Sequence, residues 1–162
     1  MQGNQSGVDT GANVAAMIAE RGLTGNYMPN CITSWAVNEK GELSIPRVDI
    51  AVDCGAQINP DRVRSQLEGA CVMGVSLAIK EEISFKAGRV VQDNYNAYEV
   101  ARMAQAPGEI RVHLIPGDFN APLGGVGEPG VPPIAPALCN AIFAATGKRI
   151  RRLPIRDQLM KA

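Results

Sequence analysis

The sequence predicts an α+β fold, with two principal helices packed on a mixed or antiparallel sheet. Three features of the 162-residue chain lead to this prediction. A hairpin pattern occupies residues 31–53, a long apolar stripe of helical period begins near residue 59, and a second helical pattern covers residues 133–146. The resulting order of hairpin, long helix, further strands and helix is typical of the α+β class.

Composition and charge are those of an ordinary globular protein. Hydrophobic residues make up 46% of the chain and charged residues 20%, and the formal net charge is zero. Because nucleic acids and anionic membranes attract an excess of positive charge, we expect neither as a partner. No apolar run is long enough to predict a transmembrane segment. The polar N-terminus lacks the apolar core of a signal peptide, and the compartment, bacterial cytoplasm or periplasm, stays open.

The chain divides into a peripheral N-terminal segment, residues 1–30, and one domain, residues 31–162. Within the first segment, Ala12–Arg21 is a short helix candidate. At the start of the domain, CITSWAV and ELSIPRVDIAVD flank the turn sequence NEKG, which predicts a β-hairpin over 31–53. Pro46 lies inside the second strand and indicates a sheet edge or a bulge there.

The run Asn59-Pro60-Asp61 is a strong helix start, with a capping residue, proline at the first position and then an acid. The helix is expected to continue to about Lys80. Its apolar stripe consists of Val63, Leu67, Ala70, Cys71, Gly74, Leu77 and Ala78. Gln66 lies at the margin of this stripe. Gly69 and Gly74 each cost roughly 1 kcal/mol in a helix relative to alanine, so they indicate close packing against the helix.

The middle of the chain contains a second hairpin signal and a strand. Residues 82–85 and 89–92 flank the turn sequence Lys86-Ala87-Gly88. In Glu109–Ile115, apolar and polar residues alternate, which predicts a half-buried strand. His113, the only histidine, falls on the polar side of that strand and is expected to be solvated.

The last third begins with a glycine- and proline-rich loop, residues 116–132, that leads into the helix Pro133–Thr146. Ile134, Leu138 and Ile142 share one face of that helix, and Gly147 ends it. RIRRLP is expected to form a short extended tail, followed by a final helical turn in IRDQLMK.

The chain has four cysteines, at positions 31, 54, 71 and 139. None forms a C-x-x-C pair, so the spacing predicts no metal site and no iron–sulfur site. A disulfide framework is not expected at this size and cysteine density. We therefore predict four buried thiols.

The stretch LGGVGEPGVPPIAP places one carboxylate, Glu128, in a stiff backbone. Glycine allows close approach of other atoms, and proline fixes φ. Gly125–Gly130 matches G-x-G-x-x-G, but a dinucleotide site needs strand, tight turn and helix directly in sequence, and prolines interrupt that order here. Glu128 is then either a partner for the dipole of the following helix or a positioned general base. Rigidity on both sides favours the general base.

Two long motifs carry a resemblance to a known family. GGVGEPGVPPIAPALCNAIFAATGKRIRRLP and AVDCGAQINPDRVRSQLEGACVMGVSLAIKEEI, with GRVVQDNYNAYEVARMAQAP between them, resemble the C-terminal portion of the molybdenum-binding large subunit of the xanthine oxidase and aldehyde oxidase family. The nearest branch is the isoquinoline 1-oxidoreductase and membrane-bound aldehyde dehydrogenase type. The resemblance covers roughly residues 31–156 in colinear order and implies a fold like that of molybdopterin-binding domains.

The resemblance implies specific roles for three residues. Glu128 matches the family's general base, which acts while oxygen derived from water is transferred to an aldehyde or an N-heterocycle. Gln66, in the Q-x-E-G motif, matches a glutamine that contacts the molybdopterin cofactor. Gly127, immediately before the base, lets the backbone approach the metal centre, and no direct metal ligand is expected in this chain.

The family's large subunits are several times longer than this chain and use other segments for much of the cofactor and substrate site. The resemblance therefore implies partners: the remainder of a large subunit, an iron–sulfur subunit and a small-molecule substrate. We expect the isolated chain neither to hold the cofactor nor to be active, and to associate with itself, for example as a homodimer. The alternative is a non-catalytic remnant or interaction domain that keeps the fold without the cofactor.

Overall fold

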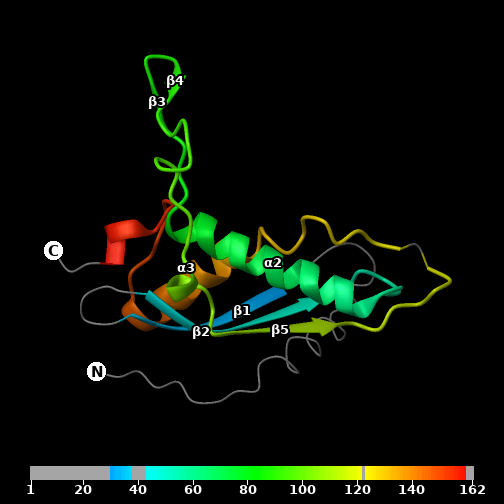
Figure 1. The fold of residues 1–162 in the computed structure, drawn as a ribbon. Coiled ribbons are helices and arrows are strands. Elements are labelled where there is room, and N and C mark those ends of the chain that lie inside the picture. The colour runs from blue at the N-terminus through cyan, green and yellow to red at the C-terminus, as the bar shows by residue number, and fades with distance from the viewer. Residues whose placement is uncertain (1–29, 38–42, 122, 160–162) are drawn as a thin grey trace.

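The computed structural model describes residues 30–37, 43–121 and 123–159, with the backbone alone described for 30–37 (Figure 1). The helix predicted at Ala12–Arg21, nearly all of the peripheral segment 1–30 and the NEKG turn lie outside the described residues. The two principal helices lie on one side of a small sheet, as the α+β prediction requires (Figure 1).

The sheet contains β1 (Asn30–Val37), β2 (Leu43–Val52) and β5 (Glu109–Leu114) in the order β1-β2-β5. β1 pairs antiparallel with β2, which confirms the predicted hairpin, and β5 pairs parallel with β2, so the sheet is mixed.

Pro46 occupies a bulge in the central strand β2. The ladder between β1 and β2 is irregular there, because Ser34 lies opposite Arg47 whereas Ala36 lies opposite Ser44. Two residues of β2, Ile45 and Pro46, thus face one residue of β1. A bulge tolerates proline because the missing N–H would have no ladder partner.

The long helix α2 (Pro60–Ile79) starts as predicted, with the Asn59 side chain accepting a hydrogen bond of 3.2 Å from the Arg62 backbone N–H. Its buried residues are Leu67, Ala70, Cys71, Gly74, Val75, Ser76 and Ala78. The predicted stripe is therefore confirmed in its central part. Ser76 is buried and polar, and its hydroxyl accepts a hydrogen bond of 2.8 Å from the Ala101 N–H.

The second helix, α3 (Ile134–Thr146), packs against α2 and β1. Ile134, Leu138 and Ile142 are fully buried along one face, as predicted. Gly147 ends the helix with a φ of 69°, a left-handed conformation that glycine adopts at little cost.

The main core joins the sheet, both helices and the C-terminal tail. Its buried members are Ile45, Val48, Ile50, Cys71, Val75, Ala78, Ile134, Leu138, Ile142, Ile150 and Ile155. The segment RIRRLP, expected to be a short extended tail, contributes Ile150 to this core. Ile155, which follows it, is also buried there, and its N–H donates to the Ala78 carbonyl at 2.7 Å. The final helical turn is the 3₁₀ helix η2 (Arg156–Leu159).

The cysteine side chains that the structure describes are free thiols. Cys54 and Cys71 are buried as predicted, whereas Cys139 is only partly buried. Burial raises the pKa of the Cys71 thiol to about 12, so it stays protonated and unreactive at neutral pH. The side chain of Cys31 lies outside the described residues.

A narrow arm separates α2 from β5. The predicted second hairpin is present, with very short strands, β3 (Phe85–Lys86) and β4 (Arg89–Val90). Both turn residues have positive φ, 50° at Ala87 and 75° at Gly88. The arm projects away from the sheet and helices (Figure 1) and leads through the 3₁₀ helix η1 (Met103–Gln105) to β5.

The two glycines inside α2 have different surroundings. A Cβ placed on Gly74 would lie 2.7 Å from the Cβ of Ile134, so α3 begins in direct contact with this glycine. At Gly69 a Cβ would meet no atom within 4 Å. The close packing predicted at both glycines is confirmed at Gly74. At Gly69 the prediction is wrong, because no described residue approaches the helix there.

These surroundings predict opposite effects of one substitution. Gly74→Ala should lower the free energy of unfolding by about 1–3 kcal/mol, because the added methyl group overpacks a rigid contact. Gly69→Ala should raise it by up to roughly 1 kcal/mol, because alanine favours the helix and has room. Urea unfolding of both variants measures this difference, and a similar loss of stability in both would contradict the packing described here.

Candidate functional site

The loop between β5 and α3, residues 115–133, returns along α2 after leaving the end of the sheet (Figure 1). Backbone contacts with the segment that follows β2 hold its first half. The Ile115 N–H donates to the Val52 carbonyl, and the Gly124 N–H donates to the Cys54 carbonyl, both at 2.9 Å. The loop is therefore attached to the end of β2 at two separate points.

The second half of this loop packs on α2. A Cβ on Gly130 would lie 2.7 Å from the Ala70 Cβ and 2.9 Å from a Leu67 methyl carbon, so only glycine fits there without displacement. Val126 packs against a small buried cluster that contains Leu67 and Cys54. The glycines and the valine thus bring the loop backbone close to the helix.

Gln66 and Gly127, which the resemblance selected as cofactor contacts, lie together. The Gln66 side-chain amide on α2 donates to the Gly127 carbonyl at 2.7 Å. Both residues are exposed, and a Cβ on Gly127 would meet no atom within 4 Å. The side-chain oxygen of Gln66 has no protein partner among the described residues, so it is available as a hydrogen-bond acceptor.

Glu128 follows directly and is also exposed. Its backbone carbonyl accepts a hydrogen bond of 3.1 Å from the Val131 N–H, which forms a turn before α3. The N-cap of α3 is Pro133, which makes no side-chain capping bond. Because the helix dipole acts mainly within the first turn, this position gives Glu128 little value as a dipole partner. Glu128 is therefore part of a backbone turn and is exposed at the surface.

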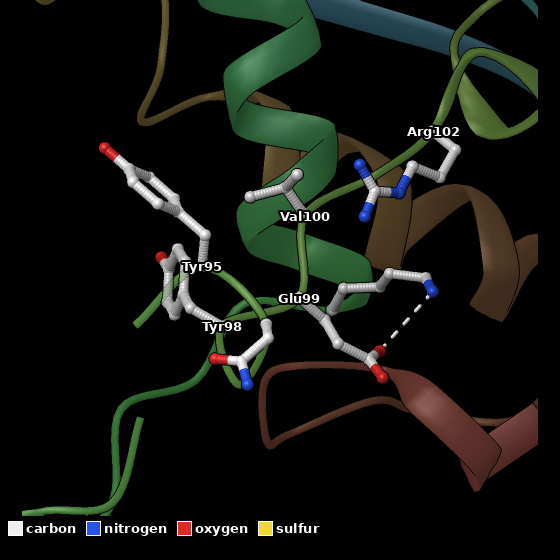
Figure 2. Close-up of a pocket in the computed structure, with 7 residues that line it drawn as sticks. Tyr95, Tyr98, Glu99, Val100 and Arg102 are labelled. Atoms are coloured by element: carbon white, nitrogen blue, oxygen red, sulfur yellow. Dashed lines mark hydrogen bonds and ion pairs between the residues drawn. The ribbon is translucent and has the colours of Figure 1, made fainter. Parts of the chain in front are cut away.

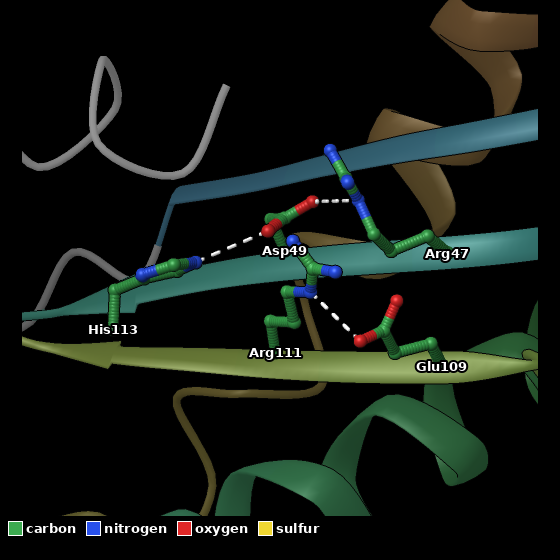
Figure 3. A network of polar contacts seen from close by, with 5 residues as sticks. All are labelled: Arg47, Asp49, Glu109, Arg111 and His113. Carbon is green, nitrogen blue, oxygen red and sulfur yellow. Dashed lines mark hydrogen bonds and ion pairs between the residues drawn. The ribbon is translucent and has the colours of Figure 1, made fainter. Parts of the chain in front are cut away.

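His113 is not the solvated side chain that the alternation predicted. Its Nε2 lies 3.1 Å from one carboxylate oxygen of Asp49, and Arg47 Nε lies 2.8 Å from the other (Figure 3). Asp49 is only 4% exposed and the His113 side chain 31% exposed. A buried carboxylate needs such partners. The contact joins β2 to β5 on the face opposite the helices, and we interpret it as structural.

A cleft of about 330 Å³ lies at the base of the arm, lined by Lys80, Tyr95, Asn96, Tyr98, Glu99, Val100 and Arg102 (Figure 2). Three of its lining residues, Lys80, Tyr98 and Glu99, have partners within the chain. Lys80 Nζ lies 3.4 Å from a carboxylate oxygen of Glu99, and the Tyr98 hydroxyl donates to Glu81, which raises the pKa of that tyrosine. None of the three residues selected from the sequence lines this cleft.

Comparison with known proteins adds a second line of evidence. The family model described as molybdopterin cofactor-binding domain matches residues 26–107, which include β1, β2, α2 and Gln66. The chain belongs to the molybdopterin cofactor-binding domain family. This family membership confirms the resemblance noted from the sequence motifs and agrees with the α+β architecture.

Relatives of this chain are oxidoreductases or their subunits, and they are much longer than the chain. The chain is 38% identical over 117 residues to isoquinoline 1-oxidoreductase subunit beta of Brevundimonas diminuta, covering 72% of this chain and 15% of the relative. It is 34% identical over 138 residues to a membrane-bound aldehyde dehydrogenase of Gluconacetobacter polyoxogenes, covering 85% and 17%. The crystal structure of the aldehyde oxidoreductase from Desulfovibrio desulfuricans matches with a TM-score of 0.65 at 25% identity, covering 80% and 15%. The chain thus spans about a sixth of these relatives.

Gln66 and Gly127 leave polar groups and backbone open at the surface. The free side-chain oxygen of Gln66 suits a hydrogen-bonding organic cofactor, and Gly127 leaves its face of the loop open. Gln66, Gly127 and Glu128 are all exposed, so they lie on the surface of the described part of the chain. Among the described residues, no helix has the length and apolarity to cross a membrane.

One residue of this region was missed at the sequence level. The Gln57 side-chain amide, located between β2 and α2, donates to the carbonyl of Ile115 at 2.8 Å and to that of Gly55. In the sequence, Gln57 is a polar residue just before a helix cap, which signals nothing specific. Only the long-range pairing of β2 with β5 brings its partner into reach.

The Gln66 contact leads to a test in solution. Gln66→Met keeps the length of the side chain and removes its donor, so the backbone at Gly127 should gain freedom. Order parameters of the amides of Val126–Glu128 should fall toward about 0.6, the range of flexible backbone, with little change in α2. NMR relaxation measures this change, with Gln105→Met as a matched control. Unchanged order parameters would mean that this hydrogen bond does not hold the loop.

Proposed function

We propose that this chain is part of a molybdenum hydroxylase subunit that oxidises an aldehyde or an N-heterocycle with oxygen derived from water. Family membership and the relatives named above support this reaction class. The observation that carries the proposal is the Gln66–Gly127 hydrogen bond, because it attaches the loop to α2 at the residue next to the exposed Glu128.

In this proposal Glu128 is the general base. A bound molybdenum cofactor would supply the two-electron redox chemistry of the reaction. The Glu128 carboxylate would accept a proton within hydrogen-bond reach, about 2.6–3.2 Å between heavy atoms.

Gln66 and Gly127 are proposed as cofactor contacts at the same site. Gln66 would use its amide hydrogen to hold the loop and its free oxygen to accept a hydrogen bond from the organic part of the cofactor. Gly127 would allow close approach, because no Cβ projects from the loop at this point. A loop attached at several points presents these groups without an ordering cost at each turnover.

The proposed assembly includes the remainder of a large subunit, an iron–sulfur subunit that accepts electrons, and a small-molecule substrate. We propose that residues 31–162 are the domain that contributes Gln66, Gly127 and Glu128 to the cofactor site. Residues 1–30 are proposed to be peripheral to that domain. The partners would supply the other walls of the cofactor site, since Gln66 and Glu128 are exposed in this chain.

Replacing the base tests this proposal. In the assembled molybdenum enzyme, Glu128→Gln should lower kcat by about 10²–10⁴, the usual contribution of a general base, because the amide cannot accept the proton. Molybdenum content should stay normal, because the amide has nearly the same shape. Glu68→Gln, an equally simple change at an exposed position of α2, is the matched control. Full turnover in Glu128→Gln would rule out the assigned role.

The second candidate is a non-catalytic remnant or interaction domain. The exposure of Gln66 and Glu128 favours this second candidate for the chain alone, because neither residue is covered by other described parts of the chain. Metal analysis of the protein purified after expression with molybdenum separates the two candidates. Stoichiometric molybdenum in the assembled enzyme supports the hydroxylase, and its absence from every assembly of this chain supports the remnant.

Exposed apolar side chains predict self-association of the isolated chain. Ile58 is 74% exposed, Met73 56% and Phe119 70%. Burying such residues between two copies removes apolar surface from water, so a homodimer should form as concentration rises. Sedimentation equilibrium should give a concentration-dependent mass that Met73→Ser lowers. A monomer at all accessible concentrations would contradict this expectation.

A further inference from the structure

Gln57 connects two segments that are far apart in the sequence. Its side-chain NH₂ group has two N–H donors, and both are used: one bonds the Gly55 carbonyl after β2, the other the Ile115 carbonyl at the start of the long loop. Gln57 itself is partly buried and belongs to neither hydrophobic cluster. Its two short hydrogen bonds are therefore with loop backbone, and its amide nitrogen also lies 3.9 Å from the sulfur of the buried Cys54.

The same region contains two close backbone crossings. A Cβ on Gly117 would overlap the carbonyl carbon of Gly55, so the two segments of backbone are in direct contact there. Farther along, a Cβ on Gly124 would lie 3.0 Å from the Cys54 carbonyl oxygen, which also accepts the Gly124 N–H. The segment that Gln57 braces thus supports the loop at its start and again just before Glu128.

We infer that Gln57 is a positioning residue for Glu128, acting through the loop backbone of residues 115–121 and 123–127. By holding Ile115 against Gly55, it fixes where the loop leaves the sheet, and the crossings at Gly117 and Gly124 carry this placement forward. Gln66 then holds the far end at Gly127. The inference rests on the proposed function of Glu128 as general base.

The loop itself can be tested in the full chain without cofactor. Gln57→Met keeps the side-chain length and removes both donors. Hydrogen exchange at the amides of Ile115 and Gly124 should become on the order of tenfold faster, because the loop opens more often once its brace is lost. Exchange in α3 should stay unchanged. Gln92→Met, which removes a comparable side-chain amide bonded to Ser84 in the arm, is the matched control and should leave both amides unaffected.

The catalytic consequence is tested in the assembled enzyme. Gln57→Met should lower kcat on the order of 10²-fold with a smaller change in KM, since misplacing a catalytic group by about 1 Å has an effect of this size. In the Glu128→Gln background the same substitution should have no further effect on kcat, because its action passes through the missing base.

The outcomes separate the two claims. Unchanged exchange at Ile115 and Gly124, or faster exchange throughout α3 as well, overturns the positioning role, because Gln57 is then either dispensable or a general stability residue. An equal loss of kcat in the presence and absence of Glu128 also overturns it. Full turnover in Glu128→Gln alone overturns the proposed function, whereas the exchange measurement still decides whether Gln57 braces the loop.

Discussion

The hydrogen bond between the Gln66 side chain and the Gly127 carbonyl connects the two parts of this protein on which the proposed function depends. One partner lies on the long helix α2, which is fixed by the core, and the other lies in a loop without regular secondary structure. At 2.7 Å this bond joins a rigid element to the residue before a carboxylate. A single contact of this kind has a modest net energy, about 0.5–1.5 kcal/mol, so its main effect is to select one position of the loop.

Glycine makes that selection compatible with close packing. At Gly74, Gly117, Gly124 and Gly130, a side chain would collide with, or press tightly on, α3, the segment after β2, or α2. At the three positions that lie in the loop, Gly117, Gly124 and Gly130, the choice of glycine therefore has a steric cause. Gly127 differs, because its missing Cβ leaves the outer face open. The same residue type serves packing inside the loop and accessibility at its surface.

Local sequence patterns predicted the elements whose causes are local. The Asn59 cap, the buried stripe of α2, the face of α3 and its end at Gly147 all follow from short-range rules. The family motifs selected Gln66, Gly127 and Glu128, and the structure brings the first two into contact. The catalytic and cofactor-binding roles of these residues stay predictions.

Features that depend on distant pairing were not predicted. The parallel alignment of β5 with β2 places His113 against Asp49 and Ile115 against Gln57, and neither contact has a signature within its own segment. The burial of Ile150 and Ile155 likewise depends on their packing against residues of β2, α2 and α3, which are distant in the sequence. Gly69 was misread because helix propensity identifies a costly glycine without saying what, if anything, approaches it.

The most direct test of this account is a crystal structure of the assembled enzyme with its cofactor bound. The account predicts that Gln66 remains bonded to Gly127 and that the Glu128 carboxylate lies within hydrogen-bond distance, about 3 Å, of a ligand of the cofactor. A structure in which Glu128 instead pairs with a basic side chain of another polypeptide, turned away from the cofactor, would contradict it.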